Sequence, residues 1–325
     1  MAGLRARLAG LFRPRGATLD DCQVYAMRLQ GRRGVAGSLR RLSPVGDYAQ
    51  AMIDPAGTRV AFWGAHPATP GHQLWVADIA TRRCRPISLA SGLTGHPCWW
   101  PDGRSLVCFS TAGVSDATDW QPARQFDPDR PAANLFRIDP ASGARQPLTR
   151  GDVVDERPAV TPDGAAVIFV SSRGGRLNLW ALDVADGGLR QLSHGVAFDY
   201  RPAISPDSTR IAYFTADADG RHVLAMLSWP AATPLAVKVN ATFDWVHGPY
   251  WAADGRALLV HARKAGAPRP ALWLIDTADG GVEPLALPGV EDCSHGTWDA
   301  GEGWLAFDSR QALGQLPATI DAPTC

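Results

Sequence analysis

Five of the six residues at equivalent places in an internal repeat have side chains that could bind a ligand or move a proton, and the sixth is a glycine. They lie five residues before a recurring Pro-Asp-Gly-like turn and are Gln50, His96, Arg157, Arg201, Gly248 and His295, with His247 beside the glycine. Imidazoles and an amide are ligands for a divalent metal such as manganese, and histidine is also a general base near neutral pH. Two neighbouring guanidinium groups favour a carboxylate or phosphate. The pattern predicts a site for a small anion.

The turn that sets this spacing occurs six times along the chain. The copies are IDPAGTRVAFW from Ile53, WWPDGRSLVCFS from Trp99, VTPDGAAVIFVSS from Val160, ISPDSTRIAYFTA from Ile204, WAADGRALLVHA from Trp251 and WDAGEGWLAFDS from Trp298. Spacings of about 40 to 60 residues are typical of propellers and repeat arrays. Each copy holds two strands around a tight turn, and a second pair such as NLWALDV follows, so four antiparallel strands would form one blade. The repeated aspartates are interpreted as turn residues.

The sixth copy ends after its second strand, near Ser309, and the N-terminal segment Gln23 to Ser43 resembles the missing outer half. We therefore predict an all-β, six-bladed β-propeller over residues 23–310, closed by the N-terminal segment. Residues 1–22 would be a tail or short helix, and residues 311–325 a C-terminal tail. Residues 110–134 form an insertion in blade 2, which is interpreted as a lid over the channel or as a floppy loop.

These phrases resemble the TolB-type β-propeller family, and the resemblance covers nearly the whole chain. The segments WVHGPYW around His247 and DCSHGTWD around His295 are also similar to blade openings of oligogalacturonate lyases. That resemblance implies a manganese ion held by histidines and a glutamine, with a histidine base and an arginine acting on a uronate. The metal set would be Gln50, His96, His247 and His295, and the catalytic candidates are His96, His247 and His295.

The innermost strand of a blade runs from one face of the ring, called the upper face, toward the other. The six repeat positions should then lie at the upper mouth of the channel, beside the insertion. Arg157 and Arg201 would hold the anion, and Tyr200 and Trp120 would add aromatic contacts. The remaining histidines, at positions 66, 72, 194, 222 and 261, are interpreted as ordinary loop residues.

Composition excludes several function classes. Lys plus Arg and Asp plus Glu each count 32, so nucleic acid is not an expected partner. No segment reaches the roughly 18 apolar residues of a membrane span, and no export signal is recognisable, so we expect a cytoplasmic protein. The cysteines show neither zinc spacing nor a disulfide framework. There is no GxSxG elbow for a peptidase, and no phosphate-binding loop or dinucleotide fingerprint.

Two functions remain. The first is a lyase or isomerase that binds a carboxylate or uronate-like molecule and removes a proton beside it with a histidine. The second is a non-enzymatic scaffold, the role of TolB itself, in which the channel accepts the tail of a protein partner. A scaffold should tolerate loss of the histidines, whereas an enzyme should not.

Overall fold

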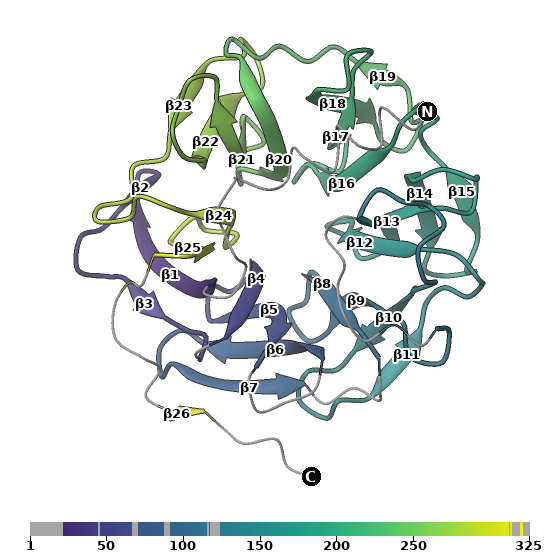
Figure 1. The fold of residues 1–325 in the computed structure, drawn as a ribbon, viewed down its shortest axis with the longest axis horizontal. Helices are drawn as coiled ribbons and strands as arrows, with labels where there is room; N and C mark the ends of the chain where they lie inside the picture. The colour runs from purple at the N-terminus through teal and green to yellow at the C-terminus, as the bar shows by residue number, and fades with distance from the viewer. Residues whose placement is uncertain are drawn as a thin grey trace.

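The computed structural model describes residues 22–44, 46–66, 71–87, 92–115, 117, 124–311, 313 and 319–320. They form six sheets arranged as a ring around a central axis (Figure 1). Within each sheet the four strands of the blade are antiparallel to their neighbours. The predicted six-bladed β-propeller is therefore confirmed.

Short apolar segments make the inner strands, since these are packed between neighbouring blades. The innermost strands are β4 (Asp47–Ile53), β8 (Thr94–Trp99), β12 (Asp155–Val160), β16 (Asp199–Ile204), β20 (Phe243–Trp251) and β24 (Ser294–Trp298). The second strands are β5 (Arg59–Ala65), β9 (Leu106–Ser110), β13 (Ala166–Ser171), β17 (Arg210–Ala216), β21 (Ala257–Lys264) and β25 (Trp304–Ser309). The second strands are almost wholly buried, as expected for strands with a sheet on either side.

The outer strands are shorter and more polar. The third strands are β6 (His72–Asp78), β10 (Asn134–Ile138), β14 (Asn178–Asp183), β18 (His222–Ser228), β22 (Ala271–Asp276) and β1 (Gln23–Gln30). The outermost strands are β7 (Arg83–Ile87), β11 (Arg145–Pro147), β15 (Leu189–Gln191), β19 (Pro234–Leu235), β23 (Val282–Pro284), β2 (Arg33–Gly34) and β3 (Arg40–Arg41). Strand β26 (Thr319–Ile320) adds to β7 in parallel. In the part of the chain covered by the structure, no helix is long and apolar enough to cross a membrane.

The N-terminal strand closes the ring as predicted. β1 pairs antiparallel with β25, from Gln23 opposite Ser309 to Arg28 opposite Trp304. The last blade is thus built from both ends of the propeller sequence, which removes a free sheet edge.

The repeated aspartates have the turn role assigned to them. Asp102 accepts a hydrogen bond from the backbone N–H of Arg104 at 2.8 Å, and Asp254 does the same with Arg256 at 2.8 Å. Asp163 accepts from Ala165 at 3.0 Å. Each carboxylate binds the backbone two residues on, which is how an aspartate stabilises a tight turn.

Tryptophans at the ends of inner strands join neighbouring blades. Trp99 Nε1 donates to the carbonyl oxygen of Met52 at 2.8 Å, from blade 2 to blade 1. Trp251 donates in the same way to Ala203 at 3.0 Å, and Trp298 to Trp251 at 2.7 Å. These side chains therefore pack between blades, and their polar atoms are used within the protein.

Candidate functional site

The six repeat positions share an unusual backbone conformation. Each starts a bulge in an innermost strand, where the register against the second strand shifts. Their φ angles are 58° at Gln50, 50° at His96, 52° at Arg157, 53° at Arg201, 50° at Gly248 and 46° at His295. Residues other than glycine rarely adopt this left-handed conformation, and such strain is concentrated at functional sites. A bulge re-aims a side chain, and here it brings six equivalent positions to one level of the ring.

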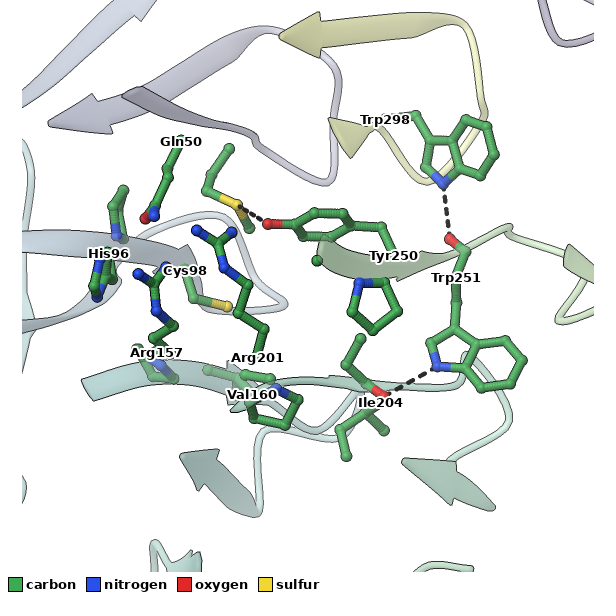
Figure 2. A pocket seen from close by; sticks show the side chains of 18 of the residues that line it. Gln50, His96, Cys98, Arg157, Val160, Arg201, Ile204, Tyr250, Trp251 and Trp298 are labelled. Carbon is green, nitrogen blue, oxygen red and sulfur yellow. Dashed lines mark hydrogen bonds between the residues drawn. The ribbon is translucent and has the colours of Figure 1, made fainter. Parts of the chain in front are cut away.

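A central cavity of about 240 Å³ begins at this level. Figure 2 shows Gln50, His96, Arg157 and Arg201 at one end, and Trp251 and Trp298 at the other. The first four are buried, whereas Ile204 and Trp298, nearer the Pro-Asp-Gly turns, are partly exposed and Pro206 is exposed. The cavity therefore extends toward the lower, turn-bearing face. The sequence predicts a site at the upper mouth, whereas the cavity reaches from these residues toward the opposite face.

Arg157 and Arg201 lie on adjacent blades and both line the cavity. The guanidinium of Arg157 stacks 4.6 Å from the ring centre of Tyr200. Arg157 is 6% exposed and Arg201 is 7% exposed. Burial, and secondarily the charge of Arg157, lowers the pKa of Arg201 to about 9. The nearby acid Asp199 does not neutralise Arg201, because its carboxylate binds Asn178 and the backbone N–H of Gly195. The two side chains thus bring two guanidinium groups together at one buried end of the cavity.

Gly248 lies against this arrangement. A Cβ atom at this position would lie 3.4 Å from Nη1 of Arg201 and 3.4 Å from Cε2 of Tyr250. A side chain at position 248 would therefore contact Arg201 and Tyr250.

Behind Arg157 lies a buried ionic cluster around Glu156. This carboxylate accepts a hydrogen bond from Tyr200 at 2.6 Å, forms an ion pair with Arg130, and lies 3.1 Å from Nδ1 of His96. Burial alone would raise the pKa of Glu156, but Arg130 and His96 hold it well below its usual range. The pKa of His96 is well below its usual value because of burial and the Arg157 charge. Glu156 is thus ionised and His96 is neutral, and their 3.1 Å contact favours the tautomer that carries the proton on Nδ1.

A separate cluster is formed by His247, His261 and His295, whose potential ligand atoms all lie within 4.8 Å of one another. Nδ1 of His295 lies 3.0 and 3.1 Å from the two carboxylate oxygens of Asp308, and its Nε2 lies 3.2 Å from Nη2 of Arg201. Because the carboxylate only accepts, Nδ1 carries the proton and Nε2 accepts from the guanidinium. Burial lowers the pKa of all three imidazoles. They are neutral near pH 7.

These donors fit some metals better than others. Three neutral imidazoles suit zinc, copper or nickel, whereas manganese prefers sites rich in oxygen ligands. The Arg201 guanidinium also occupies Nε2 of His295, so a cation would have to displace it. The cluster is therefore a poor match for manganese. Of the predicted metal set, the structure brings together His247 and His295, adds His261, and places His96 in the Glu156 cluster.

The sequence predicts that two aromatic residues, Tyr200 and Trp120, contact the ligand. Tyr200 is fully buried beneath Arg157 and is absent from the cavity lining, so it positions the arginine. Trp120 lies outside the described residues. Within the insertion, Phe126 stacks on Phe198 with ring centres 4.2 Å apart, and Arg130 reaches Glu156. This part of the insertion packs on the ring.

The sequence reasoning missed four residues that build the site. His261 was interpreted as a loop residue, which is wrong: it is buried in β21 directly opposite His247. Glu156, Asp308 and Arg130 were not assigned roles in binding or catalysis. A signal for Glu156 existed, since it precedes Arg157 in a strand where alternate side chains face opposite ways. No comparable local signal marks Arg130 or Asp308.

No family model matches the sequence. The fold is similar to TolB from Acinetobacter baumannii, with a TM-score of 0.59, 17% identity, and coverage of 92% of this chain and 66% of that one. A putative TolB from Agrobacterium tumefaciens has a TM-score of 0.64 and 14% identity, and the match covers 89% of this chain and 98% of that one. An oligogalacturonate lyase in complex with manganese has a TM-score of 0.58 and 13% identity, and the match covers 88% of this chain and 82% of that one. At these identities the likeness shows the propeller fold, as the sequence resemblance implied.

Proposed function

We propose that the protein binds a small carboxylate, uronate-like or of another class, in the central cavity, with Arg157 and Arg201 holding its charge. The observation that carries the proposal is the pair of buried guanidinium groups at the same bulge of adjacent blades, facing one cavity. Among the described residues, Arg201 contacts no carboxylate and its hydrogen bond goes to neutral His295.

Two like charges in a buried site are costly unless an anion compensates them. The low pKa of Arg201 expresses this cost. A carboxylate entering the cavity would neutralise charge at its positive end and accept several charge-assisted hydrogen bonds. The arrangement is therefore better satisfied with an anion than without one.

The same end of the cavity offers a base for an elimination or isomerisation. His96 lines the cavity, and with Nδ1–H directed at Glu156 its Nε2 carries the lone pair. Nε2 would take a proton from the carbon beside the ligand carboxylate, and the electron pair would pass into that carboxylate, where the arginines stabilise it. Expulsion of a leaving group on the next carbon completes an elimination, and return of the proton elsewhere completes an isomerisation.

His247 and His295 are assigned a supporting role, because neither lines the cavity and His295 holds Arg201. With His261 they would hold an imidazole-preferring divalent ion if Arg201 moved. No step above depends on such an ion.

The scaffold alternative uses the same site. The cavity opens toward the turn face through partly exposed apolar residues, among them Ile204 and Trp298. The C-terminal carboxylate of a partner peptide would meet the same arginines, with its last side chain against this wall. Binding of this kind would need no base.

Calorimetric titration with a panel of small carboxylates at pH 7 tests the proposal. We expect Arg157→Gln and Arg201→Gln each to weaken binding by about tenfold or more, since a hydrogen bond to a charged group contributes about 1.5–3 kcal/mol. Arg221→Gln, at a side chain 69% exposed beside Asp219, is the matched control. Equal binding by all four proteins, or by none, contradicts the proposal. An enzyme should lose turnover but keep binding in His96→Gln, whereas a scaffold would show no turnover.

A further inference from the structure

We infer that the ligand is a small carboxylate with an apolar body, of the aryl or branched aliphatic class, rather than a sugar acid. This inference rests on the proposed function and names the class of its ligand. It comes from how polar and apolar groups are distributed along the cavity.

The charged and amide side chains of the lining lie at one end. Gln50, His96, Arg157 and Arg201 are grouped at the level of the bulges (Figure 2). Beyond them the wall is formed by aliphatic and aromatic side chains, including Met52, Val160 and Ile204. A ligand is therefore met by charge and hydrogen bonds at one end and by apolar surface along the rest of its length.

The polar side-chain atoms of the aromatic residues in the apolar wall are already bonded. Tyr250 donates its hydroxyl to Sδ of Met52 at 3.4 Å (Figure 2). The indole N–H groups of Trp251 and Trp298 donate to the carbonyl oxygens of Ala203 and Trp251. The carbonyl of Met52 accepts from Trp99. None of the three side-chain donors can donate to a ligand hydroxyl without breaking a bond that joins the blades.

A sugar acid has hydroxyl groups around its whole ring. In this cavity the hydroxyls distant from the carboxylate would face the apolar wall and lose their hydrogen bonds to water, which costs about 1–3 kcal/mol for each unpaired group. An apolar ring or branched chain loses nothing there and gains from burial. The wall therefore discriminates against uronates.

The volume agrees with a ligand of one ring. A cavity of about 150 Å³ holds a benzene molecule. The 240 Å³ cavity thus accommodates one ring together with a carboxylate and a short link between them. Ile204, at the boundary of the wall, is well placed to select for this body.

Calorimetric titration of the full chain with three probes tests the inference: phenylacetate, its uncharged analogue phenylacetamide, and galacturonate. We expect phenylacetate to bind about tenfold or more tighter than each of the others, because it alone matches both ends of the cavity. Arg201→Gln should remove the preference for phenylacetate over phenylacetamide. Ile204→Thr should weaken phenylacetate binding severalfold, while Ile204→Leu keeps it, and unchanged melting temperatures show that both variants fold.

The outcomes separate the inference from the proposal beneath it. Galacturonate binding more tightly than phenylacetate, with loss in Arg201→Gln, would overturn the inference and leave the proposed carboxylate site intact. Failure of both carboxylates to bind would overturn the proposed function and the inference together. Equal affinity for phenylacetate and phenylacetamide would show that the arginines do not bind the carboxylate charge, and would overturn the inference.

Discussion

Nη2 of Arg201 lies 3.2 Å from Nε2 of His295, so the guanidinium that faces the cavity is held by a neutral imidazole. His295 is in turn fixed by Asp308, which also accepts the backbone N–H of Gln50 at 3.1 Å. The chain from Asp308 through His295 to Arg201 links the last blade to blade 4 and ends at the central cavity. It explains how an arginine is oriented without being neutralised.

Asp308→Asn is expected to weaken carboxylate binding severalfold, because an amide fixes the His295 tautomer less strongly and leaves Arg201 less well oriented. Nitrogen NMR of His295 should show loss of a single Nδ1–H tautomer, and titration should show the weaker binding. Asp186→Asn, at an exposed turn, is the control. Unchanged affinity together with a changed tautomer would contradict the positioning role of His295.

Arg201→Gln is expected to stabilise the ligand-free protein by about 1 kcal/mol while weakening carboxylate binding, since stability and function often oppose each other at such sites. The physical reason is relief of a buried like-charge pair with Arg157. Thermal and urea unfolding without ligand measure the effect. A less stable variant would indicate that the guanidinium is compensated in the free protein.

Arg130→Met is expected to destabilise the protein by about 3 kcal/mol, because it removes a buried ion-pair partner of Glu156 and leaves that carboxylate under-compensated. The double variant Arg130→Met with Glu156→Gln should recover much of this loss. Urea unfolding of the single and double variants gives the coupling. Simple addition of the two single effects would show that the pair acts independently.

Stability should fall as the pH drops from about 6.5 toward 4. Burial lowers the pKa of His222 to about 4, so in this window the unfolded chain binds a proton that the folded chain does not. His222 packs among Phe198, Phe214 and Phe126, so His222→Phe should make the melting temperature less sensitive to pH over this range. The exposed residue His194, changed to Gln, is the control. The same pH slope in wild type and His222→Phe would refute the assignment.

Zinc is expected to raise the melting temperature more than manganese, because the cluster of His247, His261 and His295 offers imidazoles alone. His261→Gln should abolish the zinc effect, and His96→Gln should leave it unchanged, since His96 lies in the Glu156 cluster. Elemental analysis of the purified variants provides an independent readout. A manganese effect lost in His96→Gln would restore the metal set predicted from the sequence.

The sequence by itself determined the ring. Turn chemistry at Asp102 or Asp163 and alternation within short strands are local properties, so six copies specify six blades, and the unfinished last copy specifies closure by Gln23–Gln30. The same count located the bulge residues, because every blade repeats one spacing. Only the tertiary structure decided which side chains meet. His96 joined Glu156 while His261 joined His295, and the cavity extended toward the turns, because these contacts depend on how side chains from neighbouring sheets pack across the ring, which no single blade encodes.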